Sequence, residues 1–171
     1  MARKWWTLLT VSIGTFMLLL DVTIVNVALP EIERDLGASL TDLQWVVDSY
    51  VLALAALTLM AGSLADRLGR RLVFTTGLAA FTAASLLAGF AGNPLTLNLA
   101  RGLQGIGGAA MFGTVLALIA QEFAPRERKT ALGIWGATVG MGVAVGRSSA
   151  AHSSTPSAGS GSSSSTCRSA P

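Results

Sequence analysis

Long apolar blocks without charge are the feature of this sequence that most constrains its fold. Residues 72–100 contain no Asp, Glu, Lys or Arg, and similar blocks precede and follow them. A helix needs about 20 mostly apolar residues to cross a bilayer. An isolated strand cannot satisfy its backbone hydrogen bonds in lipid, so the blocks should be helices. The sequence therefore predicts an all-α membrane protein.

The composition supports the same prediction. Only 12% of the 171 residues are charged, against roughly 25% in soluble domains, and the mean hydropathy is +0.59. The basic residues stand in small groups between apolar blocks, which argues against nucleic-acid binding. A single cysteine, Cys167, excludes an internal disulfide framework. The lipid bilayer is the expected partner, and no metal site is expected.

Five spans are expected, at about residues 5–29, 43–64, 72–91, 95–121 and 130–146. The triplet from Gly92 to Pro94 predicts a tight turn between the third and fourth spans. Residues 147–171 are rich in Ser, Ala and Gly and hold few side chains to bury, so we expect a disordered tail. The chain thus divides into a helix bundle over 1–146 and a tail over 147–171.

The distribution of Lys and Arg predicts the orientation. Cytoplasmic loops carry an excess of these residues. One side holds eight of them, and the other holds only Arg34. The eight are Arg3, Lys4, Arg67, Arg70, Arg71, Arg126, Arg128 and Lys129. The amino terminus should therefore be cytoplasmic.

Three polar residues inside spans are candidates for transport chemistry. A charge inside a span is costly and usually has a partner or faces a cavity. Asp21 could be a proton or cation site, or a structural acid between helices. Arg101, followed by Gln104, could be a proton-relay or gating arginine. Alternatively, Arg101 could extend to the outer membrane interface.

The segment from Gly62 to Arg71 joins the second and third spans. A positive-inside loop would explain its arginines but not Asp66 or the glycines. Gly69 can adopt turn angles, and Asp66 can pair with an arginine or favour the start of the next helix. The segment is interpreted as a functional loop. Its candidate residues are Gly62, Asp66, Arg67, Gly69, Arg70 and Arg71.

Glycines in the later spans predict close helix contacts. Gly105 follows Arg101 in the fourth span, and Gly136 and Gly140 form a GxxxG pattern in the fifth, followed by Gly146. Such patterns let a second helix approach closely. Packing within one bundle and packing between two chains both remain open.

Several of these motifs together resemble those of the major facilitator superfamily. Gly62 to Arg71 resembles its loop between helices 2 and 3, and the stretch from Leu97 to Gly107 resembles its helix-4 motif. Residues 20–30 are similar to the helix-1 motif of the fourteen-span drug/proton antiporters, and the stretch from Gly136 resembles their helix-5 motif.

The resemblance implies a proton-driven exporter of hydrophobic or cationic compounds in the bacterial inner membrane, and not an enzyme. Arg101 would take part in proton coupling, and Asp21 would belong to the outward-facing end of helix 1. Asp66 and Arg70 would belong to the cytoplasmic gate. The energy source would be the proton gradient, with no cofactor. The substrate path would lie between two six-helix halves.

The sequence departs from the family pattern after Gly146. The family continues with proline and small residues, whereas here Arg147 begins the polar tail. Codons can be chosen for residues 157–168 so that a neighbouring reading frame restores the missing family segment. We interpret the tail as out of frame and the chain as a truncated amino-terminal half. Without the carboxy-terminal half, it should not transport alone.

Two other functions remain open. The first is a major facilitator that carries a metabolite or sugar. The second is a small membrane protein that binds a full transporter or dimerises through its glycine faces.

Overall fold

The structure is a computed structural model, and it describes the backbone of residues 2–153 and the side chains of residues 4–145. This part of the chain contains five helices and no strand. The helices are α1 (Ala2–Leu36), α2 (Leu40–Leu68), α3 (Arg70–Gly89), α4 (Pro94–Glu122) and α5 (Pro125–Ser153). The prediction of an all-α fold is confirmed.

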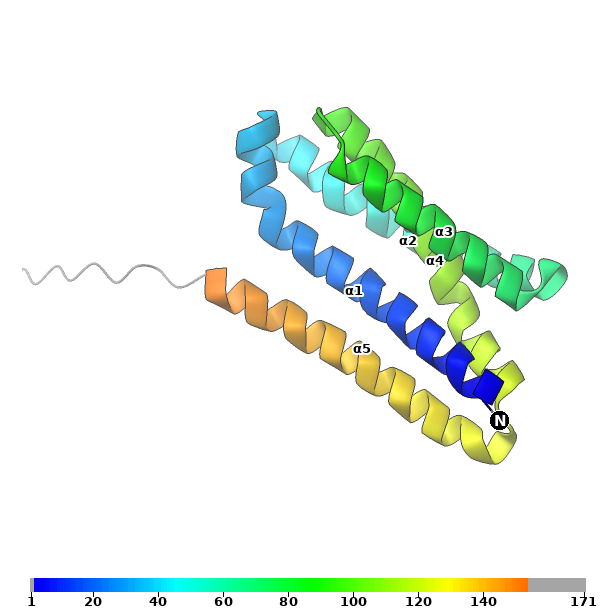
Figure 1. The fold of residues 1–171 in the computed structure, drawn as a ribbon. Helices are drawn as coiled ribbons and strands as arrows, with labels where there is room; N and C mark the ends of the chain where they lie inside the picture. Colours follow the sequence, from blue (N-terminus) through cyan, green and yellow to red (C-terminus); the bar gives the residue numbers. More distant parts are fainter. Residues whose placement is uncertain (1, 154–171) are drawn as a thin grey trace, which may run out of the picture.

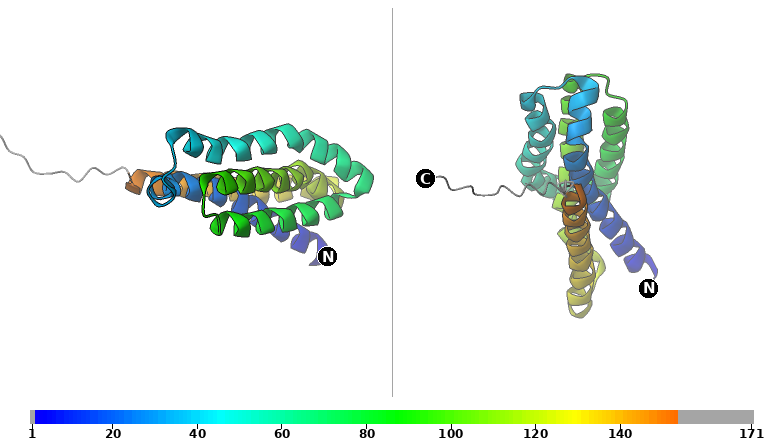
Figure 2. Two further views of the ribbon diagram at one scale, coloured as in Figure 1. Left: turned by 90° about the horizontal axis from the view of Figure 1, so that it is seen from above. Right: turned by 90° about the vertical axis from the view of Figure 1, so that its left-hand side faces the viewer.

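Consecutive helices run in opposite directions (Figure 1). The chain start and the α2–α3 and α4–α5 connections lie at one end of the bundle, called here the amino end. The α1–α2 and α3–α4 connections lie at the other end, called the far end. α2 and α3 pack on either side of α4 (Figure 2), and α1 packs beside α5.

Local sequence explains where the helices begin and end. Ser39 caps α2, because its hydroxyl accepts a hydrogen bond from the Asp42 backbone while the Asp42 carboxylate accepts one from the Ser39 backbone. Asn93 caps α4, and Pro94 occupies its first turn. Gly69 alone separates α2 from α3, with a φ of +101° that favours glycine.

The helix bounds differ from those expected from the sequence. α1 runs through Pro30 to Leu36 rather than ending near residue 29. α2 extends to Leu68, so the segment expected to be a loop is helical apart from Gly69. The apolar-to-polar boundary in the sequence is therefore not where these helices end.

The prediction of a disordered tail from residue 147 is wrong for residues 147–153, which continue α5. Loss of apolar side chains does not end a helix, because Ser and Ala are acceptable inside one and the next proline is Pro156. The remainder of the predicted tail, 154–171, lies outside the described residues.

Four described helices are long and apolar enough to cross a membrane: α1 from Lys4, α2, α3 and α4. The shortest, α3, has 20 residues, which at 1.5 Å per residue matches a hydrocarbon core of about 30 Å. Many large apolar side chains on these helices are exposed, Leu59 to 86%. A surface of this kind suits lipid, and the chain is a multi-pass membrane protein.

Glycines allow the three central helices to pack at backbone distance. A Cβ at Gly105 of α4 would lie 2.5 Å from the Tyr50 carbonyl oxygen of α2, and one at Gly107 would lie 2.6 Å from the Phe81 nitrogen of α3. Both distances are too short for a side chain. α4 is therefore held between α2 and α3 by surfaces that only glycine permits.

Candidate functional site

Arg101 and Asp21 form an ion pair inside the bundle. Arg101 Nη1 donates a hydrogen bond to Asp21 Oδ2 at 2.5 Å. The Arg101 side chain is 7% exposed and that of Asp21 is 15% exposed. Arg101 therefore does not extend to the membrane interface, and that alternative is wrong. The two residues connect α1 to α4, although they are 80 positions apart in sequence.

Gln104 joins the same carboxylate from α4. It lies three residues after Arg101, which brings both side chains to one face of the helix. Gln104 Nε2 donates to Asp21 Oδ1 at 3.3 Å, and the residue is only 1% exposed. The sequence-predicted trio is thus a single cluster in which each carboxylate oxygen of Asp21 has one donor.

Two buried polar atoms of this cluster have no partner within the described residues: Arg101 Nε and Gln104 Oε1. Buried polar groups in proteins are usually paired with protein or with water. A protein interior also penalises an unpaired charge heavily. The cluster is therefore suited to accepting a further polar group.

An open cavity of about 400 Å³ adjoins the cluster. We call it the acidic groove. It lies between α1, α3 and α4 toward the far end of the bundle. Its walls are largely apolar, and its polar lining residues are Asp21, Glu31, Asp35, Ser85, Arg101 and Gln104. Sequence reasoning assigned no role to Glu31 or Asp35. Their helical spacing from Asp21 was the available signal, since 21, 28, 31 and 35 share a face of α1.

The candidate gate residues gather at the amino end of the bundle. Asp66 Oδ1 accepts hydrogen bonds from Arg70 at 2.8 and 3.1 Å across the α2–α3 junction. Arg70 Nη1 also donates to the Ala117 carbonyl of α4 at 3.0 Å. Arg71 Nη2 donates to Glu122 Oε1 at 2.6 Å. These contacts fasten the α2–α3 junction to the end of α4.

No role was predicted for Glu122 from the sequence. It lies in the last turn of α4, where a negative charge is unfavourable because it opposes the helix dipole, so a cationic partner is expected.

Arg67 is exposed, and its side chain has no ionic or hydrogen-bonded partner within the described residues. An added Cβ at Gly62 would lie 3.6 Å from the Gly113 carbonyl oxygen, which is an ordinary contact distance.

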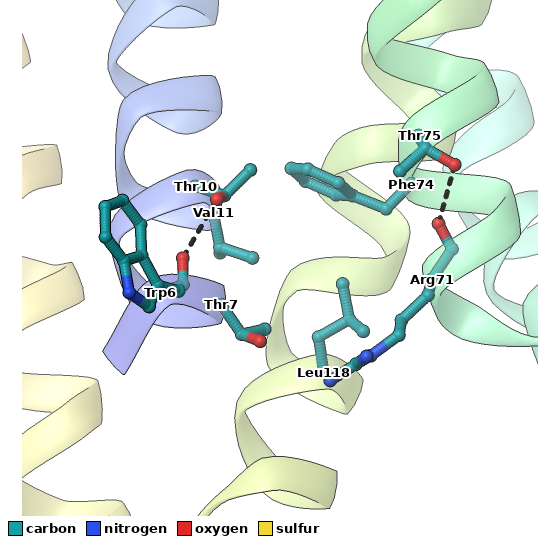
Figure 3. Close-up of a pocket in the computed structure, with 8 residues that line it drawn as sticks. All are labelled: Trp6, Thr7, Thr10, Val11, Arg71, Phe74, Thr75 and Leu118. Carbon is teal, nitrogen blue, oxygen red and sulfur yellow. Dashed lines mark hydrogen bonds between the residues drawn. The ribbon is translucent and has the colours of Figure 1, made fainter. Parts of the chain in front are cut away.

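A second cavity of about 300 Å³ lies near these residues, between α1, α3 and α4. Phe74 of α3 extends toward Val11 and Thr10 of α1, and the Arg71 side chain reaches toward Leu118 of α4 (Figure 3). The hydroxyls of Thr10 and Thr75 donate to backbone carbonyls of their own helices. This cavity therefore has Arg71 as its charged group and mostly apolar walls.

A further contact closes the amino end between α1 and α5. Lys4 Nζ lies 2.7 Å from both carboxylate oxygens of Glu127 and 5.8 Å from the centre of the Phe123 ring. The hydrogen bond from Lys4 lowers the pKa of Glu127 below its ordinary value. Sequence reasoning missed this pair, whose members are 123 positions apart.

The predicted packing glycines behave differently from one another. Gly105 makes the close contact expected of it. Around Gly136 and Gly140, an added Cβ would meet no atom within 4 Å. α5 instead approaches α1 through Gly142, where an added Cβ would lie 2.7 Å from Leu19. The surroundings of Gly146 lie outside the described side chains.

The described residues bring together no group of three or more His, Cys, Asp or Glu side chains that could hold a metal ion. The polar chemistry of the site rests on one carboxylate, one guanidinium and one amide. Charged side chains inside a membrane span usually pair with one another or face a cavity, and this set does both.

Known proteins resemble this chain over most of its length. The puromycin resistance protein of Streptomyces alboniger is 48% identical over 145 residues, 84% of this chain and 29% of that protein. The tetracenomycin C resistance and export protein of Streptomyces glaucescens is 43% identical over 84% of this chain and 27% of its own length. The multidrug resistance protein Stp of Mycobacterium tuberculosis is 43% identical over 82% of this chain and 26% of its own length.

The chain thus spans between a quarter and a third of the length of the relatives it matches. The family model described as Major Facilitator Superfamily matches residues 11–154. This match includes the helices that carry Asp21, Arg101 and the α2–α3 junction. The chain belongs to the major facilitator superfamily.

Proposed function

We propose that this chain forms part of a membrane transporter that exports drugs in exchange for protons. The family consists of transporters rather than enzymes, and several relatives are named for drug resistance or export. Those names support a multidrug type of cargo, hydrophobic or cationic. The observation that carries the proton-coupled part is the buried Asp21–Arg101 ion pair with Gln104.

The ion pair can couple proton binding to helix movement. A proton on Asp21 neutralises the carboxylate, and Arg101 then keeps a buried positive charge without its counter-ion. Leaving one partner of a buried pair alone costs about 3–5 kcal/mol. A rearrangement that gives Arg101 a new partner or water therefore becomes favourable. Because Asp21 lies on α1 and Arg101 on α4, protonation would shift the population of states in which these helices separate.

The charged contacts at the amino end would serve as the cytoplasmic gate. They tie the α2–α3 junction to α4 through Arg70 and Arg71. The excess of Lys and Arg at this end supports a cytoplasmic location, in the inner membrane of a bacterium. The rest of the gate and of the substrate path would come from the part of the transporter that the relatives have beyond this match. The 171-residue chain alone is then expected not to transport.

A chimera tests this function. Residues 1–145 would replace the matching segment of the puromycin resistance protein, and growth of a sensitive bacterium in puromycin would be measured. We expect the chimera to confer resistance and Asp21→Asn to abolish it. Asp48→Asn is the matched control, since Asp48 is an exposed acid on α2 without an ionic partner in the described structure. The proposal would be contradicted if the chimera with Asp21→Asn conferred the same resistance as the chimera without it.

A second cargo class has one specific observation in its favour. The riboflavin transporter RibZ of Clostridioides difficile is 37% identical over 83% of this chain and 31% of its own length. A metabolite transporter therefore remains the second candidate. The same chimera strategy, with riboflavin uptake and export measured in place of resistance, separates the two.

A further inference from the structure

We propose that the acidic groove is a water-filled path along which protons reach Asp21, with Glu31 and Asp35 at its mouth. The inference rests on the proposed proton coupling. It gives a role to Glu31 and Asp35, which have none in the proposed function. Three features of the groove support it: its unpaired carboxylates, two unpartnered buried atoms of its lining residues, and its dimensions.

The groove has an excess of negative charge. Asp21 is paired with Arg101, but Glu31 and Asp35 have no ionic or hydrogen-bonded partner within the described residues, and both are exposed. From α3, the polar lining residue is Ser85, which does not titrate. Tyr50 of α2 interacts electrostatically with both Asp21 and Arg101. An excess of one sign of charge along a cleft raises the local concentration of ions of the opposite sign, here protons.

Two lining residues at the inner end of the groove carry unpaired polar atoms. Gln104 lines the groove, is 1% exposed, and leaves Oε1 without a protein partner. Arg101 Nε is also unpartnered there. A cavity of about 400 Å³ exceeds the volume of one water many times over, and a buried water typically makes two to four polar contacts. In the proposed path, water entering the inner end would pair with Gln104 Oε1, Arg101 Nε and the Asp21 carboxylate.

The length of the groove requires water for proton transfer. Glu31 follows Asp21 by ten residues of α1, which corresponds to about 15 Å along the helix axis. No direct hydrogen bond spans that distance. At the inner end, a hydronium ion gives its proton to an Asp21 oxygen and remains as water. Asp21 becomes neutral, and Arg101 keeps its charge.

Thiol reactivity in lipid nanodiscs tests whether the groove is hydrated and acidic. With Cys167 replaced by Ser, Ala28→Cys reports on the groove, and Val27→Cys, outside the groove lining and 43% exposed, is the control. Thiols react as thiolates, which form in water and not in lipid. Ala28→Cys should react with methanethiosulfonate reagents, and faster with a cationic than with an anionic one.

Removing the charges of Glu31 and Asp35 tests the role of these two carboxylates at the mouth of the groove. At low salt and roughly 10 Å, each carboxylate removed should lower the cation-to-anion rate ratio at Ala28→Cys about fourfold. Glu31→Gln combined with Asp35→Asn supplies this change. The inference is overturned if Ala28→Cys reacts no faster than Val27→Cys, or if the ratio is the same with and without the two carboxylates.

Proton delivery is measured separately, from the infrared carbonyl band of protonated Asp21 after a pH jump. The Glu31→Gln/Asp35→Asn variant should protonate Asp21 at least threefold more slowly, and Asp48→Asn should leave the rate unchanged. An unchanged rate in the double variant overturns the inference. Neither readout involves a drug. If the groove thiol does not react but transport by the chimera depends on protons, this inference alone is wrong. If the groove thiol reacts as expected but transport by the chimera does not depend on protons, the proposed function alone is wrong.

Discussion

The Asp21–Arg101 pair should show strong energetic coupling. Asp21→Ala and Arg101→Ala should each lower the unfolding free energy by about 3–5 kcal/mol, since each leaves a buried charge alone. The double variant should lose less than the sum of the two. Denaturant unfolding of the parent, both single variants and the double variant in bicelles gives the coupling energy. Additive losses would contradict the ion pair, and Asp48→Ala, at an exposed position, should change stability by less than about 0.5 kcal/mol.

Glu127 predicts a pH dependence of the contact between α1 and α5. Lys4 lowers the folded-state pKa of Glu127 below 4.5, so this contact stabilises the fold fully above that value. Its contribution is lost as the pH falls through the lowered folded pKa. Carboxyl NMR of labelled glutamate should show the lowered midpoint, and Lys4→Met should raise it. Lys129→Met, at an exposed lysine, should not, and equal midpoints in the parent and Lys4→Met would refute the contact.

Asp21 is a residue whose type and position in the sequence were enough to indicate a buried polar contact. A carboxylate within an apolar span is costly enough that it demands a partner. Arg101 and Gln104 stood out in the sequence for the same reason, and the fold brings all three together. The sequence could not show which oxygen each donor contacts or which atoms remain unpaired, because these depend on how α1 and α4 are rotated.

At the scale of the helices, the sequence predicted a helix boundary correctly but not the face through which a helix packs. Gly92–Asn93–Pro94 predicted a turn, and α4 begins there because Asn93 caps it. The spacing of four between Gly136 and Gly140 also predicts a packing face, yet the face of α5 that meets α1 includes Gly142. Glycine spacing defines a flat strip on a helix. The direction in which that strip points depends on the neighbouring helices, which local sequence does not encode.

The packing of α4 can be tested with two identical substitutions in one helix. Gly105→Ala should lower the unfolding free energy by about 1–3 kcal/mol through overpacking, because its Cβ would lie 2.5 Å from the Tyr50 oxygen. Gly102→Ala is the control, since an added Cβ there meets nothing within 4 Å. It should be neutral or stabilise the helix by up to about 1 kcal/mol. Equal effects from both substitutions would show that the close approach is absent.

At the scale of the whole molecule, hydropathy and charge were enough to predict a multi-pass all-α protein. Four helices meet the requirement for spanning. The ordered motifs predicted the superfamily that the comparison finds over residues 11–154. The charged contacts at the amino end were only partly predictable. Asp66 and Arg70 are close in sequence, whereas Glu122 and Glu127 pair with residues 51 and 123 positions away.

Proton movement coupled to drug movement is the most direct test of the proposed function. The chimera with the puromycin resistance protein would be reconstituted in liposomes that contain a pH-sensitive dye, and puromycin would be added on the side from which it is exported. Drug transport should move protons in the opposite direction, and Asp21→Asn should abolish that proton movement, whereas Asp48→Asn should preserve it. Puromycin transport that continues at the same rate without a proton gradient, or that moves protons normally in Asp21→Asn, would contradict the role given to the Asp21–Arg101 pair.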